Sequence, residues 1–353
     1  MYKCKNVYIG WDIGGAHTKI CVQISSSKIM KCSIISTPLW SSHDSLKTII
    51  RTIYETYSKK FNIINAITMS GEMSDCFKDR AEGVVSILAL FCKTAMTNYV
   101  FTSNNGLLKL NKNRIIPKNI ASMNWLITAR LLKKSETNLI AVDLGSTTTD
   151  IILIRNNKCV NKRNCDLTGL QNSELIYTGA LRTPIHSVTN SITLNRKEYQ
   201  VIPEDFARMS DIYRLLKIIP ISEDYTTTSD GRTKSEFNTY RRLSRIFGFD
   251  YSTDRTKLII QLSKQIMSMQ TYMISCKIKK HINKIYKNNI KVKLLGMGIG
   301  ENVLRVICRK NKWLYIDYNK YLSLNSNSKP FSPSYMAPSS SLCVMIKNKY
   351  EKD

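Results

Sequence analysis

One pattern occurs twice in the chain, and it constrains the fold more than any other sequence feature. In both copies an apolar stretch ends at an aspartate. Glycine follows two positions later, threonine follows six positions later, and an apolar stretch resumes after seven. The copies occupy residues 7–23, where the aspartate is Asp12, and residues 138–154, where it is Asp143. Because such an internal repeat implies a duplicated unit, we predict two related α/β domains that each present one β-hairpin to a shared cleft. The alternative is two unrelated hairpins.

Each predicted hairpin turn is suited to binding phosphate. Glycine has no Cβ, so backbone N–H groups can closely approach an anion. An aspartate fixed at a strand end can hold Mg²⁺ through water, so we expect Mg²⁺ as a cofactor, with Asp12 and Asp143 as its ligands. The predicted phosphate-binding residues are Gly14, Gly15, Thr18, Lys19, Gly145, Ser146, Thr147 and Thr148.

Length and composition indicate a globular protein. The 353 residues suffice for two domains with their own cores, and 43% of them are hydrophobic. No apolar stretch approaches the roughly 18 residues that cross a membrane, and the N-terminus lacks a signal-peptide pattern, so we expect a cytoplasmic protein. The 10 cysteines show no C-x-x-C pair, which favours reduced thiols, mostly in the core, over a metal cluster.

The formal net charge of +27 would normally suggest a nucleic-acid partner. Here the lysines are spread along the whole chain. We therefore predict a positively charged cleft for small polyanions and no nucleic-acid partner. The sequence leaves the oligomeric state open, and a homo-oligomer is compatible with it.

The order of the predicted elements gives the domain limits. We assign residues 1–135 to the first domain, 136–335 to the second, and 336–353 to a C-terminal helix with a frayed tail. Within the second domain, a mainly helical insertion is predicted over about 204–289. Its predicted helices cover 209–218, 237–247, and a long stretch from about 254 into the 280s.

A polar segment, residues 70–80, follows a buried strand in the first domain. Ligand sites in α/β sheets usually lie at the carboxyl ends of strands, so Glu72 and Asp75 are candidate catalytic residues and Arg80 is a candidate substrate contact. The structural alternative is that Ser74 caps a helix and Asp75 favours its first turn.

Two loops of the second domain contain further cationic candidates. Arg182 could grip a carboxylate or phosphate with two hydrogen bonds, or it could be an ordinary exposed loop arginine. The polar loop 226–235, with Arg232 and Lys234, is either a solvated connector or a lid.

A third glycine-rich turn lies within residues 290–304, between a predicted strand and a helix. It lacks the G-x-G-x-x-G spacing, so we do not predict NAD binding. Gly296, Gly298 and Gly300 would let a flat ligand or a phosphate rest on the backbone at a helix N-terminus.

Two Asp–Gly hairpins followed by a late glycine-rich turn resemble the actin, sugar-kinase and Hsp70 superfamily. The resemblance implies a duplicated actin-like ATPase fold of the ribonuclease H-like kind, with the helical insertion in the second domain. The chain has neither a recognisable sugar-binding segment nor an Hsp70-like peptide-binding domain.

A closer resemblance covers nearly the whole chain. Seven segments in order are similar to the hydantoinase/oxoprolinase-related family of tetrahydromethanopterin-linked one-carbon metabolism: residues 10–19, 68–75, 79–83, 124–126, 142–151, 177–184 and 230–235. Characterised archaeal members of that family are condensing synthases of methanofuran biosynthesis. They join an aminomethylfuran-methyl diphosphate to γ-glutamyltyramine through an aryl ether and release diphosphate. The segments that contain Arg182 and Asp230 look more like the bacterial branch, which makes methylofuran.

The resemblance implies a transferase whose diphosphate substrate contacts both hairpins. The predicted catalytic residues are Asp12, Asp143, Asp150, Glu72 and Asp75, and one of the last three would accept the phenol proton. The predicted substrate contacts are His17, Arg80, Asn124, Arg182, Arg232, Lys234, Gly296, Gly298 and Gly300. ATP is compatible with this site but not required.

Two other function classes remain open on the same residues. One is an ATP-dependent kinase or a hydantoinase/oxoprolinase-type hydrolase. The other is a nucleotide-gated scaffold without catalysis. The release of ADP, or its absence, would separate these classes from the condensation.

Overall fold

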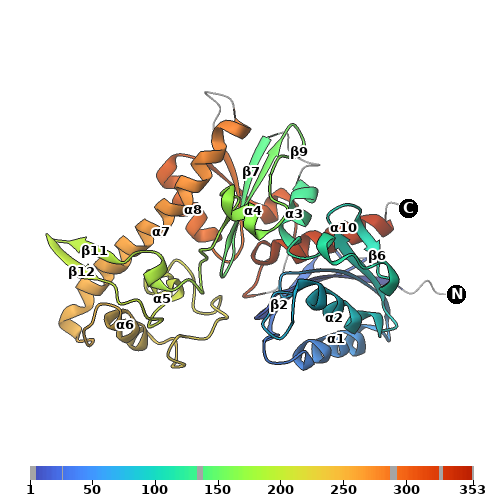
Figure 1. The fold of residues 1–353 in the computed structure, drawn as a ribbon, viewed down its shortest axis with the longest axis horizontal. Helices are drawn as coiled ribbons and strands as arrows, with labels where there is room; N and C mark the ends of the chain where they lie inside the picture. The colour runs from blue at the N-terminus through green and yellow to red at the C-terminus, as the bar shows by residue number, and fades with distance from the viewer. Residues whose placement is uncertain (1–4, 26, 133–137, 287–291, 326–328, 352–353) are drawn as a thin grey trace. The chain divides into compact units, whose positions relative to one another are not determined.

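A computed structural model describes residues 5–25, 27–132, 138–286, 292–325 and 329–351. The chain divides into two units, in agreement with the duplication expected from the repeated pattern (Figure 1). Unit 1 comprises Met1–Thr137, Asn156–Cys159 and Tyr318–Asp353, and unit 2 comprises Asn138–Arg155 and Val160–Asp317. The predicted boundary at residues 135 and 136 lies outside the described residues.

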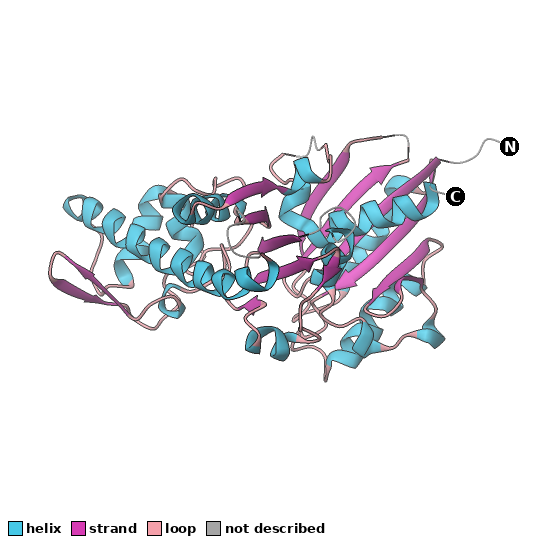
Figure 2. Cartoon of the chain, turned by 90° about the horizontal axis from the view of Figure 1, so that it is seen from above, coloured by secondary structure: helices cyan, strands magenta, loops and turns pink. Residues whose placement is uncertain are grey.

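Unit 1 is built on a six-stranded sheet with the order β3-β2-β1-β4-β5-β6, the larger group of arrows in Figure 2. β1, β4 and β5 are parallel, whereas β2, β3 and β6 run antiparallel to their neighbours. The chain therefore leaves β1, β3 and β4 at the same edge of the sheet. The strands are β1 (Lys5–Ile13), β2 (His17–Ile24), β3 (Met30–Ser36), β4 (Phe61–Met69), β5 (Thr97–Thr102) and β6 (Gly106–Lys109).

Helices cover both faces of this sheet. Side chains alternate between the two faces of a strand, so Trp11 of β1 packs in one cluster with α1 and α2, and Tyr8 packs in another with α3 and α10. The helices are α1 (Asp44–Tyr57), α2 (Arg80–Cys92), α3 (Asn124–Leu132), α9 (Tyr318–Tyr321) and α10 (Ala337–Glu351). Short 3-10 turns are η1 (Lys112–Arg114), η2 (Pro117–Asn119) and η5 (Pro333–Met336).

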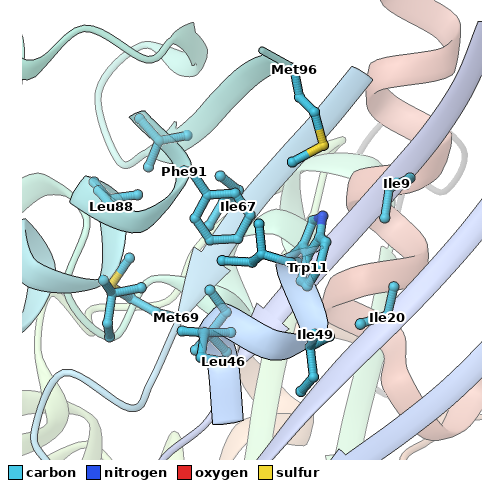
Figure 3. Close-up of a cluster of buried hydrophobic side chains, with 14 of the residues drawn as sticks. Ile9, Trp11, Ile20, Leu46, Ile49, Ile67, Met69, Leu88, Phe91 and Met96 are labelled. Atoms are coloured by element: carbon cyan, nitrogen blue, oxygen red, sulfur yellow. The ribbon is translucent and has the colours of Figure 1, made fainter. Parts of the chain in front are cut away.

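Trp11 lies at the centre of the first cluster, among side chains from β4, α1 and α2 (Figure 3). Its ring meets the Phe91 ring edge-on, with the centroids 5.2 Å apart. The indole N–H donates to the Asn65 side-chain oxygen at 2.9 Å, so this polar atom is satisfied in the core.

The C-terminal segment belongs to unit 1, and this differs from the predicted limits. Residues 318–335 were assigned to the second domain and 336–353 to a separate helix and tail. Instead, α10 packs directly on β1, with the backbones so close that a Cβ at Gly10 would lie 1.9 Å from the Ser339 carbonyl oxygen. The buried residues of α10 include Ser339, Ser340 and Ser341 beside Leu342, Cys343 and Ile346, and the serines interrupt the apolar pattern that would indicate a buried helix. Residues 352 and 353 of the predicted tail are outside the described residues.

Unit 2 contains a five-stranded path with the order β10-β8-β7-β13-β14. β7 and β8 form the second hairpin, and β7, β13 and β14 are parallel. The strands are β7 (Asn138–Leu144), β8 (Thr149–Arg155), β10 (Leu175–Ile176), β13 (Lys293–Met297) and β14 (Leu314–Asp317). A separate hairpin is formed by β11 (Ser191–Leu194) and β12 (Lys197–Gln200). The two-residue strand β9 (Lys158–Cys159) is counted with unit 1 but pairs with β8.

The helices predicted over 204–289 are present, and α5 and α6 pack against the long helix α7 (Figure 1). Residues 287–289 are outside the described residues. The helices of unit 2 are α4 (Asp166–Gln171), α5 (Met209–Leu215), α6 (Glu236–Arg245), α7 (Thr256–Ile285) and α8 (Glu301–Asn311), with 3-10 turns η3 (Ile185–Ser187) and η4 (Thr253–Arg255). Within the described ranges, no helix combines the length and apolarity of a bilayer span.

The nine described cysteines carry free thiols, and Cys4 is outside the described residues. Only Cys21, Cys32, Cys308 and Cys343 are buried, and Cys76 is exposed. The prediction that most cysteines lie in the core is therefore wrong, because Cys92, Cys159 and Cys165 lie at the ends of helices or in a two-residue strand, where they are only half-buried.

Candidate functional site

The first turn, residues 14–17, connects β1 to β2 and is closed by a hydrogen bond from Gly14 N to His17 O at 3.1 Å. Asp12 lies two residues before Gly14, is 5% exposed, and pairs in register with Lys19. The Thr18 side chain points inward, and its hydroxyl lies 2.9 Å from that of Thr37. The turn therefore offers backbone N–H groups and Lys19 at its surface, while the Thr18 hydroxyl braces the neighbouring segment.

Two further segments lie against the first turn, because the chain leaves β3 and β4 at the same edge. Leu39 N donates to Gly15 O at 2.9 Å. A Cβ at Gly71 would lie 2.8 Å from Gly14 C and 2.8 Å from the Leu39 side chain. Three backbone segments thus meet at a distance that only glycine permits.

The predicted carboxylates of residues 70–80 lie in different environments. Glu72 is fully buried and accepts a hydrogen bond from the Ser122 hydroxyl at 2.9 Å. Asp75 is exposed. Helix α2 begins at Arg80, and its N-cap is Asp79, which accepts from Glu82 N at 2.9 Å. The alternative that Ser74 caps this helix is therefore wrong: its hydroxyl instead donates to Gly71 O, which closes a tight turn.

The other predicted substrate contacts of unit 1 are half-buried. His17 pairs in register with Ser36 at the beginning of β2, so it lies in the first turn itself. Asn124 is the first residue of α3, and its side-chain oxygen accepts from Trp125 N at 2.9 Å. Asn124 is thus tied to the helix N-terminus.

The second turn, residues 145–148, has the same closing hydrogen bond as the first. Gly145 N donates to Thr148 O at 2.9 Å, and these two residues correspond to Gly14 and His17 in the repeat. Asp143 is half-buried at the end of β7. The pattern therefore produces the same turn in both units.

The segment after β10, residues 179–182, supports the second turn through backbone hydrogen bonds. Ala180 N donates to Gly145 O at 2.8 Å, and Arg182 N donates to Ser146 O at 2.8 Å. Gly179 packs against the turn so closely that a Cβ would lie 2.5 Å from Thr147 N. Arg182 therefore belongs to the segment that supports the turn, and its side chain is exposed.

Helix α7 holds this supporting segment through Gln270, a residue that the sequence analysis missed. The fully buried Gln270 amide donates to Thr178 Oγ1 at 2.7 Å and to Gly179 O at 2.9 Å, and its oxygen accepts from the Tyr213 hydroxyl of α5. The missed signal was a polar residue in the apolar stripe of α7, between Ile266 and Ile274.

Asp150 is engaged in an ion pair. Its carboxylate bonds to the Arg163 guanidinium, which also pairs with Asp166 at 2.9 Å. Arg163 is itself buried. The Asp150 carboxylate is thus engaged by Arg163 and is less accessible to a substrate than an exposed aspartate would be.

The third glycine turn covers the end of β7. Gly298 has φ +86°, and a Cβ there would lie 2.4 Å from Asp143 Oδ1. Gly300 N donates to Leu144 O at 2.9 Å. The predicted ligand role of Gly296 meets an obstacle, because the space above it is already filled by the Tyr315 ring.

Ion pairs hold the loop that contains Arg232 and Lys234 in place. Asp230 pairs with the buried Arg242 at 3.1 Å, and Lys234 Nζ lies 3.7 Å from the buried Asp224. Burial works to raise the pKa of Asp230, but the Arg232 backbone N–H and the Arg242 guanidinium outweigh it and hold that pKa below its usual value. Of the two predicted cationic contacts, Arg232 is exposed and Lys234 is half-buried.

The carboxylates near the turns fit the ligand preference of Mg²⁺. No group of three or more His, Cys, Asp or Glu side chains forms a metal site in the described parts of the chain. Mg²⁺ typically keeps several waters and binds one or two carboxylates together with substrate phosphates. A single aspartate beside each turn, Asp12 or Asp143, is compatible with that mode.

Comparison with known proteins gives concordant results. The sequence model of the family described as hydantoinase/oxoprolinase matches residues 64–321. The (4-{4-[2-(gamma-L-glutamylamino)ethyl]phenoxymethyl}furan-2-yl)methanamine synthase of Methanocaldococcus jannaschii is 30% identical over 308 residues, which cover 85% of this chain and 88% of that protein. The synthase of the same name from Methanococcus vannielii is 30% identical over 216 residues, 60% of this chain and 92% of that protein.

Among solved structures, nucleotide-free acetone carboxylase is similar with a TM-score of 0.54 and 10% identity, over 96% of this chain and 70% of that one. At this identity the likeness concerns the fold alone. The fold is the mixed α/β, actin-like ATPase fold that the two hairpins and the late glycine turn predicted.

Proposed function

Because the chain belongs to the hydantoinase/oxoprolinase family, we propose that it is a synthase of methanofuran-type cofactor biosynthesis. The observation that carries the proposal is the 30% identity with the Methanocaldococcus jannaschii synthase over 85% of the chain. The name of that synthase describes a product in which an aminomethylfuran is joined through a methylene ether to a phenol with a γ-glutamylaminoethyl group.

The proposed reaction is a condensation that forms an aryl ether. The phenol oxygen of a γ-glutamyltyramine-like acceptor bonds to the methylene carbon of an aminomethylfuran-methyl diphosphate. The bond from that carbon to the diphosphate oxygen breaks, and the electron pair leaves with diphosphate. The phenol proton goes to a base. In the bacterial branch the same step would serve methylofuran.

We assign phosphate binding to each of the two turns, taken separately. The N–H groups of Gly14 and Gly145 already close the turns, so those of Gly15 and Ser146 would donate to phosphate oxygens, and Lys19 would add a positive charge. Such preformed donors favour the transition state because negative charge grows on the leaving diphosphate. When bound, Mg²⁺ would neutralise part of this charge, and the carboxylate that would hold it is Asp12 at the first turn or Asp143 at the second.

Asp75 is our candidate for the base. Of the three carboxylates considered, Glu72 is fully buried and Asp150 is paired with Arg163. Asp75 is exposed on the segment that packs against the first turn. A carboxylate suffices as the base because the phenol becomes acidic as its oxygen bonds to carbon.

The test is to incubate the purified protein with the furan diphosphate, γ-glutamyltyramine and Mg²⁺, and to follow both diphosphate release and the mass of the ether product. We expect equal amounts of the two. Asp12→Asn should lower kcat by about 100-fold, while Asp44→Asn, a change of an exposed aspartate in the same unit, should leave it unchanged. Diphosphate release without ether formation would contradict the proposal.

Incubation with ATP and Mg²⁺ tests the other function classes. The proposed condensation predicts no steady ADP release. Steady release would favour a kinase or an ATP-dependent hydrolase, and tight retention of nucleotide without turnover would favour a scaffold.

A further inference from the structure

The edge of the unit 1 sheet where the chain leaves β1, β3 and β4 exposes two large apolar side chains. Trp40, in the segment after β3, is 53% exposed, and Met73, in the segment after β4, is also 53% exposed. Isolated exposed apolar residues are common. These two differ because both belong to the segments that pack directly on the first turn.

Backbone contacts fix these segments next to the turn. Thr37 N donates to Ala16 O at 2.9 Å, and Leu39 N donates to Gly15 O at 2.9 Å, so Trp40 follows directly after a residue bonded to the turn. On the other side, a Cβ at Gly15 would lie 3.0 Å from the Ser74 hydroxyl oxygen. Met73 is therefore the neighbour of a residue in contact with Gly15.

The same two segments also contact each other further along. The His43 ring stacks on the Phe77 ring, with centroids 5.0 Å apart and planes 14° apart. His43 Nε2 lies 3.8 Å from the Cys76 sulfur. Contacts at Leu39 and at His43 thus hold the first segment against the second on both sides of Trp40.

We propose that Trp40 and Met73 form a surface that binds the ring of the furan-methyl diphosphate beside the first turn. The inference rests on the proposed function, since it names the part of that substrate which this surface takes. An indole face and a thioether both make favourable contacts with a flat aromatic ring. The ring of this substrate lies one methylene from its diphosphate, so a diphosphate on the turn brings the ring to adjacent residues.

The test compares two inert ligands. In 2-(furan-2-yl)ethyl diphosphate the additional methylene prevents ionisation, and ethyl diphosphate lacks the ring. For the wild-type protein we expect the furan ligand to bind about tenfold more tightly than ethyl diphosphate in calorimetry, as an aromatic contact would provide. Trp40→Ala should abolish this ratio without changing the affinity for ethyl diphosphate, and Trp40→Phe should retain most of it.

Ile116→Ala is the matched control, because Ile116 is 51% exposed in the same unit but lies in a different segment. It should keep the wild-type ratio, while Met73→Ala should reduce it. Tryptophan fluorescence gives a second measurement: the furan ligand should change the emission of the wild-type protein, and Trp40→Phe should remove that change.

A wild-type ratio near one, or an unchanged ratio in Trp40→Ala, would overturn the inference. These outcomes are independent of turnover. A protein that shows the ring preference through Trp40 but forms no ether would support the ring surface and contradict the proposed reaction. A protein that forms the ether with no effect of Trp40→Ala on binding or KM would support the reaction and contradict the surface.

Discussion

At Gly10, in the middle of β1, an added Cβ would lie 1.9 Å from the Ser339 carbonyl oxygen and 2.8 Å from Cys343 N. Both neighbours are backbone atoms of α10, so they cannot move aside as a flexible side chain would. Helix α10 can therefore pack this closely on the sheet only if residue 10 is glycine. The sequence offered no sign of it, because Gly10 is an ordinary residue in an apolar stretch.

Gly10→Ala should destabilise the protein by about 3 kcal/mol through overpacking against α10. Urea denaturation followed by circular dichroism measures the change. Gly231→Ala is the control: no atom lies within 4 Å of its added Cβ, but φ is +67°, so we expect a loss of about 1 kcal/mol from backbone strain alone. Equal losses at both glycines would refute the packing explanation.

His281 makes stability depend on pH. The buried ring lies with Nε2 3.0 Å from Ser173 O and Nδ1 3.3 Å from Lys284 Nζ, which suits a neutral imidazole that donates once and accepts once. Burial lowers the pKa of His281 from 6.5, and Lys284 and Lys280 add to the effect, while the Ser173 carbonyl and Glu174 oppose it.

Below pH 6.5 the unfolded chain binds a proton at this histidine that the folded protein does not yet bind. The free energy of unfolding should therefore fall as pH decreases from about 6.5 towards the folded-state pKa. Urea titrations between pH 7.5 and 5.5 measure this slope. His281→Gln, which cannot titrate, should show a shallower slope than the wild type, and an unchanged slope would assign the pH dependence to other groups.

Among the elements, the two hairpins were the most predictable. The spacing of Asp12, Gly14 and Thr18 gave the strand, turn and strand, and the structure shows equivalent closing hydrogen bonds at Gly14 and Gly145. Which side chains face a ligand was harder to predict. The Thr18 hydroxyl points inward because strand alternation places it on the buried side, where it meets Thr37.

The support of the second turn by α7 could not be predicted, since it joins residues about 90 positions apart. The sequence predicted that this helix is long, but not that one amide in its apolar stripe would bond to the backbone at Gly179. Pairings over such separations depend on the tertiary fold and leave no local pattern.

Gln270→Met should weaken the binding of ethyl diphosphate about tenfold, because Gly179 would no longer be held against the second turn. It should also cost about 2 kcal/mol of stability, since the Gly179 carbonyl and the Tyr213 hydroxyl lose their partner in the interior. Calorimetry and urea denaturation measure the two effects.

Gln261→Met is the matched control, because Gln261 is exposed on the same helix. It should change neither quantity. If Gln270→Met lowers stability but leaves the affinity for diphosphate intact, Gln270 supports the fold without positioning the turn.

At the scale of the whole molecule, the duplication was predictable and the path of the chain was not. The repeat indicated two units, but unit 1 is completed by residues from the far end of the sequence, Tyr318–Asp353. The buried serines Ser339, Ser340 and Ser341 of α10 resemble a polar surface segment in the sequence. Their hydroxyls form hydrogen bonds with nearby backbone oxygens and with Tyr318, so these polar groups are satisfied in the interior.

A variant that ends at Asp317 should lose the cooperative unfolding of unit 1 and retain that of unit 2. Without α10 only α3 packs on one face of the first sheet, whereas unit 2 keeps all of its residues. Limited proteolysis with mass spectrometry should show cleavage throughout residues 5–132 and protection within 138–286. A variant that ends at Glu351 is the control and should resist cleavage in both ranges.

The distant origin of α10 also has a consequence for protein synthesis. Ribosomes add roughly 5–20 residues per second, so about 11–46 s separate the emergence of the last strand of the first sheet from that of helix α10. During this interval the nascent sheet exposes an apolar face around Tyr8 and Phe101. The unit that is translated first is thus the last to be finished, and chaperones have the longest opportunity to bind it.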